Sequence, residues 1–108
     1  MKNLFAVLLS VVHSVLLRML GISETNYNPT KEQLEGVFDW PIWTKEPSSF
    51  PWHYDSNESC YFLEGDVTVT PEGGEPVTMG KGDLVTFPAG MSCHWEISVA
   101  VKKHYDFH

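Results

Sequence analysis

The chain has 108 residues, a length that predicts a single domain. Its 14 acidic and 7 basic residues give a net charge of -7, which repels phosphate backbones, so nucleic-acid binding is not expected. Two cysteines are too few for a disulfide scaffold, and the lack of a C-x-x-C pair excludes a structural zinc knuckle.

Residues 1–22 form an apolar N-terminal segment. Its centre, residues 4–17 (LFAVLLSVVHSVLL), would make a helix of about 21 Å, shorter than a bilayer core of about 30 Å. With Lys2 before it, this run favours a signal peptide or signal anchor, and therefore the secretory pathway or membrane association. No small-x-small cleavage site follows. An unprocessed apolar helix and an organelle transit peptide therefore stay open, and with them a cytoplasmic or organellar location.

Residues 23–28 are polar and predict a linker, which places the folded domain at residues 29–108. A capping-box pattern with Thr30 as N-cap and Gln33 three residues later predicts a short helix. Gly36 is expected to end it.

After Phe50 the pattern changes to that of strands separated by turn residues. Strands are expected at Glu58–Leu63, Asp66–Thr70, Val77–Met79, Leu84–Phe87, Cys93–Ile97 and Val101–Phe107. Hairpin turns are expected at Glu64–Asp66, Pro71–Gly74 and Gly80–Asp83. Roughly six to eight short strands with turns every 8 to 12 residues or so predict an antiparallel sandwich or barrel.

Two motifs make this prediction more specific. Glu58 stands seven residues before Gly65 in ESCYFLEG, and Gly82, Pro88 and Gly90 follow the order G-x5-P-x-G in GDLVTFPAG. Together they resemble the two short motifs of the cupin superfamily. The run from about Pro29 to Phe107 is similar to the small single-domain cupins related to ureidoglycine aminohydrolase and ethanolamine-utilisation proteins.

The resemblance implies an all-β cupin jelly-roll barrel (the RmlC-like, double-stranded β-helix fold). To this barrel the sequence adds the short N-terminal helix and the extra apolar N-terminal helix. Because this fold carries many functions, and most of the group are unassigned, fold alone does not determine an activity.

The resemblance also implies where a metal would bind. Metal-binding cupins have two histidines and a glutamate in the first motif and a histidine in the second. Here the glutamate is kept as Glu58. The histidine positions fall on Trp52 and Tyr54, or on Pro51 and His53 if the loop is one residue longer, and on Cys93. Indole cannot coordinate a metal, so no tightly held metal is expected. The weak candidates for holding a divalent ion are Glu58, Cys93, His53 and His104.

Strand periodicity places Glu58 on one face with Cys60 and Phe62, and Cys93 on one face with Trp95. If these faces point inward, an aromatic cavity results. A buried carboxylate is costly unless paired or protonated, so Glu58 is interpreted as a ligand-binding or acid–base group. The alternative is a carboxylate held by a tyrosine or a backbone amide. The expected ligand pocket is Trp52, Tyr54, Glu58, Cys60, Phe62, Cys93 and Trp95.

Glu58 and Cys93 are the catalytic candidates. A nucleophilic Cys93 would need a base beside it, and a small buried apolar role is the alternative. His53 and His94 are expected to face outward, the direction of His104 is ambiguous, and Lys102–Lys103 is expected to be a solvated face.

Three functions therefore stay open. The first is binding of a small organic ligand in the barrel. The second is a metal-dependent enzyme similar to ureidoglycine aminohydrolase. The third is a non-catalytic structural or interaction barrel. Whether the chain is an enzyme is undecided. A homodimer is expected because so short a chain buries only a modest fraction of its surface.

Overall fold

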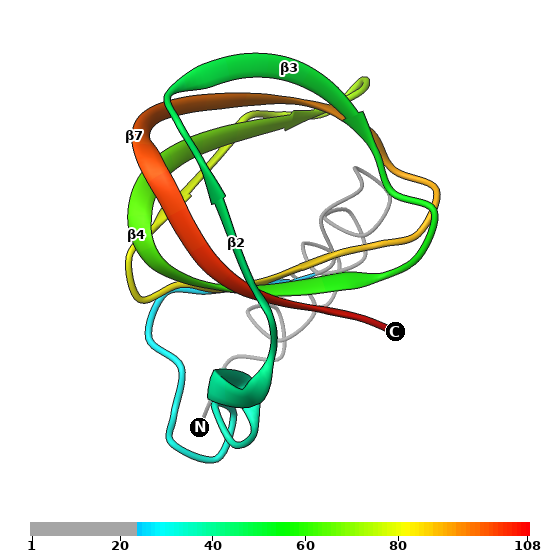
Figure 1. The fold of residues 1–108 in the computed structure, drawn as a ribbon. Coiled ribbons are helices and arrows are strands. Elements are labelled where there is room, and N and C mark those ends of the chain that lie inside the picture. Colours follow the sequence, from blue (N-terminus) through cyan, green and yellow to red (C-terminus); the bar gives the residue numbers. More distant parts are fainter. Residues whose placement is uncertain (1–23) are drawn as a thin grey trace, which may run out of the picture.

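The computed structural model describes residues 24–108, and there the chain forms a seven-stranded antiparallel sheet rolled into a barrel (Figure 1). The strands are β1 (Glu24–Asn26), β2 (Ile42–Lys45), β3 (Ser48–His53), β4 (Glu58–Pro71), β5 (Val77–Gly80), β6 (Leu84–Phe87) and β7 (Ser92–Phe107). This architecture confirms the all-β prediction. The apolar segment 1–22, with its expected helix at 4–17, lies outside the described residues.

The two long strands, β4 and β7, pair along nearly their whole length and belong to both layers of the barrel (Figure 1). The first half of β4 pairs with β6, and the second half of β7 pairs with β2, so one layer has the order β1-β6-β4-β7-β2. The second half of β4 pairs with β5, and the first half of β7 pairs with β3, which makes the other layer. Two layers that share bent strands enclose a single core.

The bend in β4 is at Gly65, where the predicted hairpin at Glu64–Asp66 is wrong. The strand runs on through these residues, and its register against β7 shifts between Phe62 and Val67. Gly65 has a φ of 127°, a conformation that favours glycine. A bulge of this kind bends a strand without ending it, so β4 crosses from one layer to the other.

The last two predicted strands, Cys93–Ile97 and Val101–Phe107, are in fact one strand, β7. Residues 98–100 between them are exposed, which interrupts the alternation of buried and exposed positions but not the strand. The turns predicted at Pro71–Gly74 and Gly80–Asp83 lie between β4 and β5 and between β5 and β6, as expected.

The capping-box pattern of the N-terminal part forms, but the predicted helix does not. The Gln33 amide donates to Thr30 Oγ1 (3.2 Å), and the Thr30 amide donates to Gln33 Oε1 (2.8 Å). Turns follow, and the only helix in residues 24–108 is the three-residue 3-10 helix η1 (Val37–Asp39), which begins after Gly36 instead of ending there. So short a segment does not make up the cost of helix nucleation.

Glu24–Asn26, inside the segment expected to be a linker, pairs with β6 as the edge strand β1. No helix within the described part of the chain is long and apolar enough to cross a membrane.

The core lies where the inner faces of the two layers meet. In β4, residues Cys60, Phe62, Val67 and Val69 are fully buried, and they alternate with more exposed neighbours on each side of the bend. This is the period of two that predicted the strands. The partly buried residues packed against the core are Trp43, Phe50, Val77 and Tyr105.

Candidate ligand-binding site

The loop between β3 and β4, just before Glu58, is bonded to the turn of the second motif. The amide of Gly90 donates to the carbonyl of Tyr54 (2.6 Å), and the amide of Tyr54 donates to the carbonyl of Met91 (2.9 Å). The amide of Ala89 donates to Asn57 Oδ1 (2.8 Å). These bonds place the Tyr54 side chain inside the barrel, where it is 3% exposed and stacks on Phe87.

Beside Tyr54 is a cavity of about 230 Å³, lined mostly by aromatic side chains and by the charged pair Glu58 and Lys103. It is lined by Trp43, Phe50, Trp52, Tyr54, Glu58, Trp95, Lys103, Tyr105 and Phe107. Four of the residues expected in a pocket, Trp52, Tyr54, Glu58 and Trp95, are among them. Cys60 and Phe62 are fully buried and do not line it.

Glu58 is 6% exposed, and its Oε2 atom accepts two hydrogen bonds. One comes from Lys103 Nζ (2.9 Å) and the other from Cys60 Sγ (2.8 Å), while Nζ also donates to Sγ (3.2 Å). No residue in 24–108 bonds to the other oxygen, Oε1, and it is not sealed from solvent. The carboxylate therefore has one oxygen committed to the protein and one available to a ligand.

Lys103 corrects the prediction of a solvated face at Lys102–Lys103, because its side chain is buried and ion-paired. Its register partner on β2 is Trp43, and its Nζ lies 4.9 Å from the Trp43 ring centre and 4.8 Å from that of Trp95. Strand alternation could have predicted this burial, since Val101 and Lys103 share a strand face. The prediction of exposure followed instead from the general rule that lysine is rarely buried unless it is paired.

Burial shifts the pKa values of Cys60, Lys103 and Tyr54. It raises the pKa of the Cys60 thiol to about 12, although the nearby ammonium of Lys103 lowers it in part. Burial lowers the pKa of Lys103, but Cys60 and Glu58 raise it by more, and the net direction is upward. Burial also raises the pKa of Tyr54. At neutral pH the site therefore holds an ammonium, a neutral thiol and a neutral phenol.

Alkaline pH is expected to destabilise the protein through Cys60. A thiol has an ordinary pKa of 9.0, while the folded value is about 12, so between these values the unfolded chain binds fewer protons. Stability from this group is complete below pH 9 and is lost as the pH rises toward 12, by about 1.4 kcal/mol per pH unit.

Urea denaturation across this range would measure the slope. Cys60→Ala should make it shallower, although Tyr54, whose pKa burial also raises, keeps part of the dependence. A stability that stays level through the window in the unmodified chain would contradict the buried, neutral thiol.

The three histidines whose directions were considered from the sequence lie away from the cavity. His53 and His94 are exposed, as expected, and bond to Ser92 Oγ (2.8 Å) and Ser49 Oγ (2.6 Å). His104 is 6% exposed, but its Nδ1 is 2.8 Å from the carbonyl of Trp40, just after η1, and it does not line the cavity. None of these histidines is brought to Glu58.

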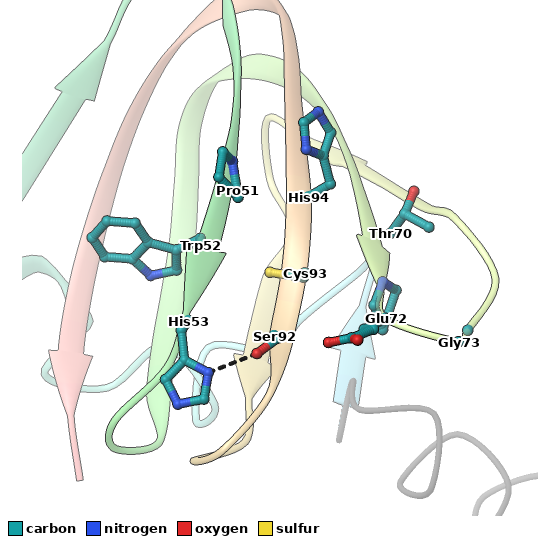
Figure 2. Close-up of a pocket in the computed structure, with 11 residues that line it drawn as sticks. Pro51, Trp52, His53, Thr70, Glu72, Gly73, Ser92, Cys93 and His94 are labelled. Carbon is teal, nitrogen blue, oxygen red and sulfur yellow. Dashed lines mark hydrogen bonds between the residues drawn. The ribbon is translucent and has the colours of Figure 1, made fainter.

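Cys93 lies in a different hollow, which is broad and open and is lined by residues from β3, β4 and β7 (Figure 2). Figure 2 shows the Cys93 thiol on the side of β7 that faces Trp52, its register partner on β3, with the His53–Ser92 hydrogen bond below it in this view. Burial raises the pKa of Cys93 to about 11, so its thiol is protonated at neutral pH. This does not favour a nucleophile. Both cysteines are free.

Ser92 and His53, which line the open hollow, form a chain of contacts with the nearby Asp55, but this chain does not make a hydrolase triad. His53 Nδ1 faces Ser92, and its Nε2 is 3.8 Å from Asp55 Oδ1. The Asp55 side chain is 99% exposed, so water solvates the carboxylate and it does not fix the imidazole as the buried aspartate of a triad does.

The residues at the implied metal positions do not fit a divalent ion. The Tyr54 hydroxyl accepts a hydrogen bond from Trp95 Nε1 (3.2 Å), and Trp52 has no donor atom for a metal. Glu58 Oε2 is already bonded to an ammonium. Across residues 24–108, no three His, Cys, Asp or Glu side chains converge on a point that could hold a metal. The geometry gives no support to a metal-dependent aminohydrolase.

Comparisons with known proteins agree with this architecture. The model of the EutQ-like cupin domain matches residues 32–105. A DUF861 family protein from Thermotoga maritima is 48% identical, with a TM-score of 0.76 over 81% of this chain and 99% of that one. No protein with curated annotation matches.

Two longer proteins share the fold over part of their length. A DUF861 protein of unknown function from Pseudomonas syringae is 28% identical, with a TM-score of 0.55 over 59% of this chain and 28% of that one. The Clostridium difficile EutQ protein is 19% identical, with a TM-score of 0.54 over 59% of this chain and 50% of that one, a likeness of fold alone. From the matched family model and the Thermotoga relative, this chain belongs to the EutQ-like cupin domain family.

Proposed function

We propose that this cupin binds a small, uncharged organic molecule in the cavity beside Glu58. The observation that carries the proposal is the free oxygen of a buried carboxylate. Oε2 of Glu58 is bonded to Lys103 and Cys60, while Oε1 has no partner in residues 24–108 and Glu58 lines the cavity. Oε1 is not sealed from solvent, so a ligand that enters the cavity can reach it and donate an N–H or O–H group to it.

Charge balance favours a neutral ligand. The negative charge of Glu58 is matched by the positive charge of Lys103, and burial keeps the Cys60 thiol and the Tyr54 phenol neutral by raising the pKa of each. A charged ligand would add an unpaired charge to a buried site, which costs more than its hydrogen bonds return.

The volume of the cavity and the side chains that line it indicate the size and shape of the ligand. A water molecule occupies about 30 Å³ of liquid, so a cavity of about 230 Å³ holds an organic molecule on the order of ten non-hydrogen atoms. The walls are indole, phenol and phenyl rings, which favour a flat or hydrocarbon body. The head group would donate to Glu58 Oε1 and accept from Tyr54 or Lys103, a pattern that a primary amide meets.

Three probes with the same ring and different head groups test this proposal. Benzamide is neutral, benzylammonium is a cation and benzoate is an anion. Benzamide is expected to raise the unfolding temperature of the full-length chain and to change its tryptophan fluorescence, and the two ions are expected to do neither. Binding of an ion in preference to benzamide would overturn the ligand class. Binding of no probe would leave the non-catalytic barrel as the better account.

Glu58→Gln should weaken benzamide binding about tenfold or more, because it replaces the charged acceptor with a neutral amide of the same size. The matched control is Glu96→Gln, on the exposed face of β7. Titration calorimetry on both variants, with circular dichroism to check folding, makes the measurement. Equal affinity in the two variants would show that Glu58 does not contact the ligand.

A further inference from the structure

The ammonium of Lys103 is held by the contacts that would bind a free cation. Lysine normally keeps this group in water, but here the residue is 5% exposed. Nζ lies 2.9 Å from Glu58 Oε2, and the ring centres of Trp43 and Trp95 are 4.9 and 4.8 Å away.

Each of these contacts has a known role in cation recognition. An aromatic ring attracts a cation that lies within about 6 Å of its centre, and indole does so most strongly. A carboxylate compensates the charge once water is removed. The three groups come from different strands, Trp43 from β2, Glu58 from β4 and Trp95 from β7, so the barrel itself brings them together.

We infer that Trp43, Glu58 and Trp95 form a cage for a primary alkylammonium ion, and that Lys103 of the same chain is its resident ligand in place of a divalent metal. The cage is a property of the folded barrel and does not depend on the neutral ligand proposed above. Lys103 supplies the cation at a site where Trp52, Tyr54 and Cys93 stand at the implied histidine positions.

The charge and donor set of the cage explain why it should select an ammonium and not a metal. Indole faces offer electron density to a cation but no lone pair to a metal ion. Divalent ions need several oxygen, nitrogen or thiolate donors, and among residues 24–108 the cage offers one carboxylate, Glu58, and the thiol of Cys60, which burial keeps protonated by raising its pKa. A metal at Glu58 would also lie close to the positive charge of Lys103.

Chemical complementation tests the cage directly. Lys103→Ala removes the side chain beyond Cβ, and n-propylammonium is the missing fragment. Millimolar n-propylammonium is expected to raise the unfolding temperature of full-length Lys103→Ala by several degrees. It should not stabilise the wild type, where the tethered lysine acts at a high effective concentration.

Two controls separate the cage from general effects. The neutral isostere n-propanol should not stabilise Lys103→Ala, and n-propylammonium should not stabilise the double variant Glu58→Gln/Lys103→Ala. If Lys103→Ala is unfolded alone, folding restored by n-propylammonium supports the cage. A variant that the amine neither stabilises nor refolds overturns it, as does equal stabilisation by propanol.

A second measurement uses the wild-type chain, with Glu58→Gln as its comparison. Manganese, nickel and zinc chlorides are each expected to leave the wild-type unfolding temperature at its metal-free value. A rise in the wild type that Glu58→Gln abolishes would show a metal at this carboxylate and overturn the assignment of Lys103 as the resident cation.

Discussion

Lys103→Met is expected to lower the free energy of unfolding by about 3–5 kcal/mol, because it leaves the carboxylate of Glu58 buried without its partner. Glu58 and Lys103 are 6% and 5% exposed, so neither charge is screened well by water. Methionine is similar to lysine in length and apolar, so the substitution removes the charge while filling most of the volume. A loss of this size is a large part of the stability of a small domain. Urea denaturation at neutral pH measures it.

Two further variants decide whether charge is the cause. Lys102→Met, one residue away on β7, is a half-buried lysine with no side-chain bond in the described structure, and it should change stability by less than about 0.5 kcal/mol. Glu58→Gln/Lys103→Met removes both charges and should recover much of the loss. If the double variant is no more stable than Lys103→Met, lost packing and not an unpaired charge would be the explanation.

Gly80→Ala is expected to destabilise the protein by about 3 kcal/mol, through a clash at the bend of β4. A Cβ atom at Gly80 would lie 2.6 Å from the carbonyl oxygen of Gly65, which is nearer than such atoms approach. That oxygen belongs to the backbone and cannot rotate away. Because β5 pairs with β4 at this point through Asp66 and Gly80, relief would require the two strands to separate. The unfolding midpoint in urea is again the measurement.

Gly73→Ala is the matched comparison, since a Cβ atom there meets nothing within 4 Å. Gly73 has a φ of 72°, so alanine would be strained by about 1 kcal/mol but would not clash. The loss at Gly80 should therefore be clearly larger. Similar losses at both positions would mean that β5 can move away from Gly65 at little cost.

The strands and most turns were predictable because they depend on local chemistry. Val67 and Val69 alternate with threonines, and both are fully buried, as a strand with one inner face requires. Gly90 has a positive φ in the turn that the second motif predicted. These features need no knowledge of which strands lie side by side.

The bend at Gly65 was not predictable from its neighbours. Glu64-Gly65-Asp66 has the composition of a hairpin turn, and the same residues also suit a bulge within a strand. The difference is made by β7, which pairs with β4 on both sides of the bend. Because the same strand, β7, pairs with the residues before and after Glu64-Gly65-Asp66, β4 continues through this triplet and does not turn back.

Half of the candidate site was predictable and half was not. The inward direction of Glu58 followed from its phase with Cys60 and Phe62, and all three are buried. Its partner Lys103 is 45 residues further along the chain. The pairing of the two strands, and not any local pattern, brings the ammonium to the carboxylate.

By itself, the sequence determined an antiparallel sandwich or barrel with Glu58 on one strand face with Cys60 and Phe62, because period-two alternation and turn glycines act over a few residues, and its two motifs resembled those of the cupins. Only the tertiary structure decided that a lysine neutralises this glutamate, that one carboxylate oxygen stays free, and that Cys93 lies in another hollow. The physical reason is that charge pairing and cavity shape depend on strands distant in sequence, whose register is set when the two layers close on one core.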